Sequence, residues 1–369
     1  MKNRIVMLVL AAALIVSLVF VGCAPEEVAP TPGGVPPTPA PEKEVFEWTY
    51  QRGAGRAGTR MWEYNLEWAE KVEKASDGRL IIEMVLGGAV CPSTKEFEAV
   101  HNGVLEIGTG SCAWCLDLIP TGSIFAAPVG GMDADGMRVW YEYGGGKELW
   151  DRATERFNVV SIAENPIQNF TPEIWCFSTF PIKTMADLQG KKMRAMGDAG
   201  AILNRLGLSV VFLPPGEIYE SLQRGVLDMA ESTGPNSIVE SAYYEIAQYY
   251  YFSSTRAATD CGFTWVNKDA WEELPPDLQE ILIAETRWMG WQSLDSMIYD
   301  DKEALDTLRE YGCIIERLPA DINKAFLAEA KLFFEEKAAE DPFFAEVLAS
   351  QAEFSRLYEE LVLLHTPLE

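Results

Sequence analysis

The sequence has few basic residues and almost no histidine. Its 369 residues contain 30 lysines and arginines against 56 aspartates and glutamates, which gives a formal charge of −26 at pH 7, and only two histidines. Binding of nucleic-acid phosphates requires clustered basic residues, so this composition argues against a nucleic-acid partner. It also disfavours an anionic membrane surface as a direct partner of the folded body.

The sequence also lacks the common catalytic motifs. It contains no nucleophile elbow of the G-x-S-x-G type. The stretch "GGGKEL" (144–149) has neither the spacing nor the Ser/Thr of a phosphate-binding loop. With two scattered histidines, acid–base catalysis would have to rest on carboxylates, which are too numerous for one pair to be singled out. The sequence therefore gives an enzyme no positive support.

The cysteines are few and mostly isolated. Cys112 and Cys115, in "CAWC", have the spacing of a redox or zinc motif. A zinc site needs two further ligands, and the remaining cysteines and the two histidines stand far apart in the sequence. A local disulfide or a pair of buried thiols is the better interpretation.

The N-terminus carries a targeting signal. Lys2 and Arg4 precede an apolar run from Ile5 to Gly22, and Cys23 follows. The pattern predicts a lipoprotein signal peptide over residues 1–23, because "VFVGC" resembles a lipobox in which Cys23 is lipidated. An uncleaved anchor helix is the alternative, since the run is just long enough to span a membrane. Either interpretation places the body outside the cytoplasm.

A proline-rich linker and an α/β body follow the signal. Residues 24–45 are rich in proline and glycine and indicate a semi-extended tether. Beyond it, "FEWTYQ" (46–51) predicts a strand, and "GTRMWEYNLEWAEKVEKASDG" predicts a helix that stops at 76–78. "RLIIEMVL" predicts the next strand. The alternation indicates an α/β architecture with largely parallel sheets, and the length suggests two domains.

A short internal echo suggests that two lobes are built alike. "HNGVLEIGTG" begins at residue 101 and "QRGVLDMAES" at residue 223. In each, a helix should end on a glycine, Gly103 or Gly225, and a strand should follow over 104–107 or 226–229. Ligands of open α/β sheets bind beyond the carboxyl ends of strands, so the loops after these two strands should line a cleft.

The stretch "LQGKKMRAMG" (188–197) is basic within an acidic chain. Thr184 is expected to cap a short helix that stops at Gly190, and "KKMRAM" then predicts a strand. Arg194 lies near the carboxyl end of that strand, where its planar fork can bind a carboxylate through two charge-assisted hydrogen bonds. A surface arginine on an edge strand is the alternative.

A longer pattern around this arginine resembles a known family. "DLQGKKMRAMGDAGAILNRLGLSVVFLPPGEIYESLQRGVLDMAES" is similar to the solute receptors of TRAP transporters, the DctP-like family, and the likeness extends over most of 46–282. "WYEYGGGKELWD" and "YYEIAQYYYF" resemble the subgroup that receives 2-oxo or 2-hydroxy monocarboxylates. The matching positions are Asp187, Leu188, Gly190, Lys192, Arg194, Gly216, Glu217, Tyr219, Leu222, Gly225, Asp228 and Glu231.

The resemblance implies a set of site residues. Arg194 would clamp the ligand carboxylate, while Glu231 and Ser232 would help to hold a sodium or calcium ion beside it. Ser232 stands where the subgroup has a large aromatic residue, which implies a wider pocket. The loop "ENPIQNFTPEIW" also departs from the subgroup. The other expected ligand-binding residues are Gln168, Asn169, Trp175 and Thr233, with Ser232 in both sets.

The resemblance also implies a two-lobed architecture like that of periplasmic binding proteins, with a central ligand cleft. Lobe I is expected over 46–162 plus 254–310, and lobe II over 163–253. Residues 311–369 should form amphipathic helices that pack across the lobes. These helices could instead contact a second copy and form a homodimer.

The implied function is that of a lipid-anchored extracytoplasmic receptor. It would capture a small organic acid in the cleft and deliver it to the membrane permease subunits, with no cofactor required. A receptor of an ATP-driven importer is the first alternative, because that class shares the architecture. A secreted enzyme on a similar two-lobed scaffold is the second.

Overall fold

The structure is a computed structural model that describes residues 43–53, 57–162 and 168–365, without the side chains of 168 and 169. The chain divides into a first unit that ends at Lys43 and a second unit, Glu44–Glu369. The predicted signal peptide, Cys23 and the linker up to residue 42 lie outside the described residues. The fold below is that of the second unit.

Two mixed sheets form the body. The first has the order β2 (Leu80–Val85), β1 (Phe46–Arg52), β3 (Ile107–Ser111), β11 (Cys261–Asn267) and β4 (Val159–Ser161), and β5 (Gln168–Asn169) also pairs with β11. The second has the order β12 (Ile314–Arg317), β10 (Tyr249–Phe252), β6 (Ile174–Ser178), β9 (Met229–Ser232), β7 (Lys192–Arg194) and β8 (Ser209–Val211).

The expectation of largely parallel sheets is confirmed, with one strand in each sheet that runs against the others. β1 pairs in parallel with β2 and β3, but β11 runs antiparallel to β3, β4 and β5. In the second sheet β6 runs antiparallel to both β9 and β10. The reason lies in the connections: β6 follows directly on β5 of the first sheet, and β11 follows directly on β10 of the second. Each starts where the parallel strands end, so it runs against them.

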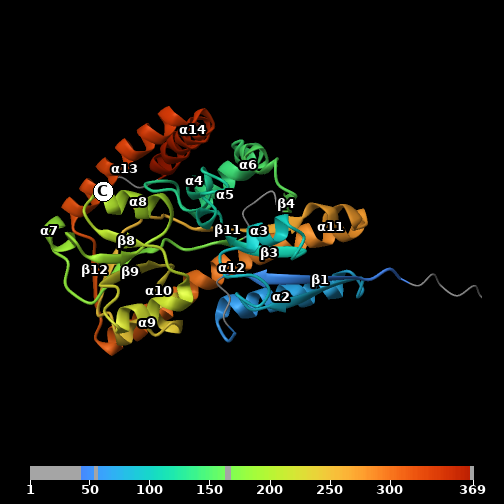
Figure 1. Cartoon of the computed structure of the whole chain (residues 1–369), viewed down its shortest axis with the longest axis horizontal. Coiled ribbons are helices and arrows are strands. Elements are labelled where there is room, and N and C mark those ends of the chain that lie inside the picture. Colours follow the sequence, from blue (N-terminus) through green and yellow to red (C-terminus); the bar gives the residue numbers. More distant parts are fainter. Residues whose placement is uncertain (1–42, 54–56, 163–167, 366–369) are drawn as a thin grey trace, which may run out of the picture. The chain divides into compact units, whose positions relative to one another are not determined.

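Helices connect and cover the strands (Figure 1). Those before β9 are α2 (Arg60–Ala75), α3 (Glu96–His101), η1 (Cys112–Trp114), α4 (Gly122–Ala126), α5 (Ala134–Tyr143), α6 (Gly146–Thr154), α7 (Met185–Leu188), α8 (Gly197–Arg205), η2 (Pro215–Glu217) and α9 (Ile218–Gln223). Those after it are α10 (Pro235–Glu240), η3 (Tyr243–Glu245), α11 (Lys268–Glu273), α12 (Pro276–Tyr311), α13 (Ala320–Glu340) and α14 (Pro342–His365). In the described part of the chain, none is both long and apolar enough to traverse a bilayer.

The internal echo is present, with both strands displaced by three residues. α3 and α9 each end at a left-handed glycine, Gly103 (φ 69°) and Gly225 (φ 70°). In each copy the valine after the glycine is exposed and the next leucine is buried. The strands therefore begin at Ile107 and Met229 instead of 104 and 226. A helix-stop turn needs these intervening residues to return the chain to the sheet.

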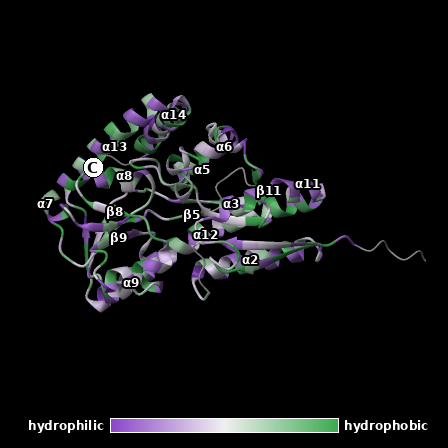
Figure 2. Cartoon of the chain, viewed as in Figure 1, coloured by the Kyte–Doolittle hydropathy of each residue, from purple (hydrophilic) through white to green (hydrophobic). Residues whose placement is uncertain are grey.

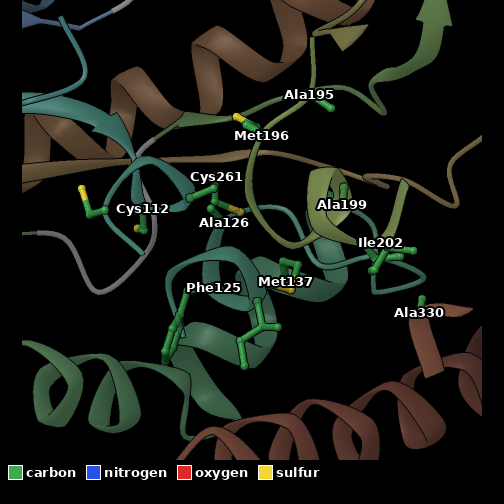
Figure 3. Close-up of a cluster of buried hydrophobic side chains, with 14 of the residues drawn as sticks. Cys112, Phe125, Ala126, Met137, Ala195, Met196, Ala199, Ile202, Cys261 and Ala330 are labelled. Atoms are coloured by element: carbon green, nitrogen blue, oxygen red, sulfur yellow. The ribbon is translucent and has the colours of Figure 1, made fainter. Parts of the chain in front are cut away.

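The largest hydrophobic core joins segments far apart in the sequence. It includes side chains from α4, α5 and α8, from β6 and β11, and from the C-terminal helices. Figure 3 shows part of it, with Phe125, Met137, Ile202, Cys261 and Ala330 among the labelled residues. The predicted helices after Pro319 are present as α13 and α14, and Figure 2 shows hydrophobic and hydrophilic residues interleaved along both ribbons.

The predicted domain boundaries stay a prediction, and two strands pair in a different part of the structure from the one that their predicted range implies. β5, within the range expected for lobe II, pairs in the first sheet, and β12, within the expected C-terminal helices, pairs in the second. The 36-residue helix α12 contacts both α2 and α10. Among the cysteines of the second unit, Cys112 and Cys115 are buried free thiols, so "CAWC" forms no disulfide in this structure.

Candidate functional site

A cavity of roughly 600 Å³ opens at the strand ends of both sheets. Arg52 and Thr109–Ser111 line it from the ends of β1 and β3, and Arg194 and 231–234 line it from β7 and the end of β9. The two loops that the echo predicted as cleft-lining are therefore both present at the cavity. Its size is within the range of small-molecule sites.

Arg194 is the predicted clamp, and the structure places it at this cavity. Its guanidinium is only 4% exposed. Nε donates a hydrogen bond to the carbonyl of Leu213 (2.9 Å), and Nη1 donates to Oε1 of Glu231 (2.5 Å). Nη2 makes no hydrogen bond or ion pair within the described residues. Nη2 is therefore the donor left for a ligand, and the hydrogen bonds from Nε and Nη1 hold the guanidinium in place.

Glu231 belongs to a buried chain of ion pairs that we call the charged cluster: Arg194, Glu231, Arg256 and Glu173. Oε2 of Glu231 lies 2.8 Å from Nη1 of Arg256, and Nη2 of Arg256 lies 2.5 Å from Oε2 of Glu173. Arg256 also donates from Nε to the carbonyl of Trp175 and from Nη2 to that of Ile174. Arg256 is thus fully engaged by the protein, whereas Arg194 keeps one nitrogen for a ligand.

Two acids at the cavity hold their protons more tightly than usual. Burial raises the pKa of Glu173 to about 8; Arg256 opposes this shift and the nearby Glu231 adds to it. Burial also raises the pKa of Asp260 to about 6, against the hydrogen bond from Ser111. A buried carboxyl resists ionisation because the charged form loses its hydration. Burial therefore disfavours the charged form of both carboxyl groups.

Arg52 is a second cavity arginine that sequence reasoning missed. It is the last residue of β1 and lies buried in the cavity lining. Burial lowers its pKa, while Tyr50, Asp260 and Glu96 raise it. Its position at the carboxyl end of an expected strand was a usable signal. Glu173, Asp260 and Arg256 gave no such signal, because they lie in loops without periodicity.

The other expected ligand-binding residues divide into three groups. Ser232 and Thr233 line the cavity. Trp175 does not; it is buried in the main core and packs edge-on against Phe326. The backbone of Gln168 and Asn169 pairs with β11, and their side chains lie outside the described part. Trp175 and Cys176 both pack into the main core, whereas Ile174 and Phe177 pack into another cluster, and the pairing of β6 with β9 shifts register between Ile174 and Phe177.

The expected ion ligands do not fit a metal in this arrangement. Both oxygens of Glu231 face guanidinium groups, and the Ser232 carbonyl lies 3.5 Å from Nη2 of Arg256. An added cation would meet two arginines at close range. Within the described residues, no group of three or more His, Cys, Asp or Glu is arranged to hold a metal ion.

Comparison with known proteins gives consistent results. A curated relative, the monocarboxylate 2-oxoacid-binding periplasmic protein of Nostoc sp. (strain PCC 7120), is 29% identical over 76% of each chain. A TRAP periplasmic solute binding protein from Colwellia psychrerythraea, solved with calcium and pyruvate, is 25% identical, with a TM-score of 0.83 over 87% of this chain and 98% of that one.

A second TRAP periplasmic solute binding protein, from Pseudoalteromonas atlantica with sodium and pyruvate, is 24% identical, with a TM-score of 0.83 over 87% and 97% of the two chains. These likenesses confirm the predicted two-lobed α/β fold. The family's members and the solved relatives are solute-binding receptors rather than enzymes. The sequence model of the DctP family, the bacterial extracellular solute-binding proteins of family 7, matches residues 55–341, so this chain belongs to that family.

Proposed function

We propose that this protein is the extracytoplasmic receptor of a TRAP-type secondary transporter and captures a small organic acid in the cavity between its two sheets. The observation that carries the proposal is the Nη2 of Arg194, which has no hydrogen-bond or ion-pair partner among the described residues and lies at the cavity. The curated relative that binds 2-oxo monocarboxylates supports the same ligand class.

The charges around the cavity suit one bound carboxylate. Arg52, Arg194 and Arg256 supply three positive charges. Glu231 pairs with two of these arginines, and burial raises the pKa of Glu173 beside them. Arg52 and Arg194 line the cavity and suit an anionic group of the ligand. Arg194 would bind it from the second sheet and Arg52 from the first, so one carboxylate would draw the two lobes together.

Delivery, anchoring and assembly are further parts of the proposal. The receptor would pass its ligand to the two membrane subunits of the permease. Lipidation of Cys23 and the linker over 24–45 would hold the body near the membrane. A homodimer would form through the C-terminal helices, and α14 offers exposed Leu357, Leu361 and Leu364 at helical spacing for such a contact.

Purified protein tests the proposal directly. Ligand released by denaturation would be identified by mass spectrometry, and a panel of acids (pyruvate, lactate, 2-oxoisovalerate, phenylpyruvate and glucuronate) would be screened by thermal shift. We expect a carboxylate in the released fraction and at least one stabilising acid. The proposal fails if no acid raises the melting temperature and the released fraction contains none.

A further inference from the structure

Apolar and aromatic side chains line part of the cavity away from the charged cluster. Its lining includes a set that we call the apolar wall: Met61, Tyr64, Trp114, Phe170, Tyr243 and Met297. A three-carbon acid would fill only a small part of roughly 600 Å³ and would leave most of these side chains without contact. The wall therefore matches a ligand with an apolar body larger than that of pyruvate.

Trp114 is held in this wall by a hydrogen bond and by close packing against two glycines. Its Nε1 donates a hydrogen bond to Sδ of Met196 (3.2 Å), which joins η1 to the end of the second sheet's β7 segment. A Cβ added at Gly53 would lie 2.8 Å from the indole, and one at Gly110 would lie 3.0 Å from it. The two glycines let the ring lie against the backbone, so the indole is held in place before any ligand arrives.

The rest of the lining disfavours a second acidic group on the ligand. Glu217, Glu240 and Asp301 are all part of it. The remaining cation, Arg60, pairs with Asp300 (3.1 Å) and lies over the ring of Tyr64. A second carboxylate placed away from the charged cluster would thus meet three acids and one arginine that is already paired.

We propose that Trp114 is the stacking surface for a planar apolar group of the ligand, and that the cavity selects monocarboxylates that carry a ring over the three-carbon acids. The proposal rests on the function proposed above and deepens it, because it names the ligand class and the residue that discriminates it. An indole face attracts a flat ring by stacking and by the apolar area that both remove from water.

The test compares two acids with the same 2-oxo acid head group, phenylpyruvate and pyruvate, by isothermal titration calorimetry. The wild-type protein should bind phenylpyruvate at least about tenfold more tightly than pyruvate. Trp114→Ala should weaken phenylpyruvate about tenfold or more and leave pyruvate within about twofold, whereas Trp114→Phe, which keeps a ring, should lose about threefold or less.

Trp291→Ala is the matched control, because Trp291 lies on α12 outside the cavity lining, 48% exposed beneath Arg138. It should change neither affinity. Equal or tighter binding of pyruvate by the wild type overturns the inference, as does an equal loss of both acids in Trp114→Ala or a failure to bind phenylpyruvate. The proposed function survives each of these results if any acid of the panel binds, and fails only if none does.

Discussion

The charged cluster and the apolar wall are two parts of one cavity that are held in place in opposite ways. In the cluster, Arg256 binds Glu173, Glu231 and two backbone carbonyls, so each group depends on its neighbours. In the wall, Trp114 is held by packing against Gly53 and Gly110. A change in the cluster should therefore disturb the fold and the binding of every carboxylate together, whereas a change at Trp114 should alter the choice of ligand besides its packing against the main core.

Removal of Arg256 should break the cluster with the largest effect on stability. Arg256→Met leaves the carboxyl groups of Glu173 and Glu231 buried without their shared partner. We expect the free energy of unfolding to fall by about 3–5 kcal/mol, measured by urea denaturation. The control is Arg205→Met, which breaks an exposed pair with Glu336 and should cost less than about 1 kcal/mol. Equal effects of the two variants would contradict the account.

The raised pKa values of Glu173, in the charged cluster, and of Asp260 beside it predict how the stability of the protein depends on pH. Both groups bind protons in the folded state at pH values where the unfolded chain has released them, since their pKa values are raised from 4.5 to about 8 and from 3.8 to about 6. The free energy of unfolding should therefore fall as pH rises, over about 4–6 from Asp260 and about 4.5–8 from Glu173.

Glu173→Gln isolates this contribution. The variant should show a shallower decline of unfolding free energy between pH 6 and about 8, as measured by urea denaturation at each pH. The wild type also carries repulsion from a net charge of −26, which both proteins share apart from the one residue. Identical slopes in the two proteins would show that Glu173 does not titrate in this range.

Removal of calcium and sodium ions should have the smallest effect on the affinity for the ligand. Both oxygens of Glu231 are paired with arginines, so carboxylate binding in this arrangement needs no ion as a bridge. We expect the affinity for a bound acid to stay within about twofold after treatment with EDTA and exchange into sodium-free buffer. A loss of tenfold or more, restored by calcium or sodium, would show that an ion displaces one of the arginines from Glu231.

The contrast between cluster and wall also explains what the sequence could predict. Arg194 and Glu231 lie in a long pattern that resembles a family, and the strands that carry them follow from periodicity and helix stops. Arg256 and Glu173 come from loops that are far apart in the sequence, so no local pattern marks them. Trp114 was present in "CAWC", but the interpretation of that stretch concerned only the two cysteines, as a local disulfide or buried thiols.

The strand positions show a second physical limit. The helix stops at Gly103 and Gly225 were recognisable, but each following valine was read as the first strand residue. In the structure those valines face solvent, and pairing starts at Ile107 and Met229. A β-branched residue after a glycine fits a turn exit as well as a strand, and only the neighbouring strand decides between them.

The central claim is that Arg194 binds the ligand's carboxylate, and calorimetry of Arg194→Ala beside Lys192→Ala tests it most directly. Lys192 is exposed on the same strand and serves as the matched cation. With an acid that the wild type binds, Arg194→Ala should lose about 2–5 kcal/mol of binding free energy, and Lys192→Ala should lose almost none. Wild-type affinity in Arg194→Ala, or equal losses in the two variants, would contradict the account.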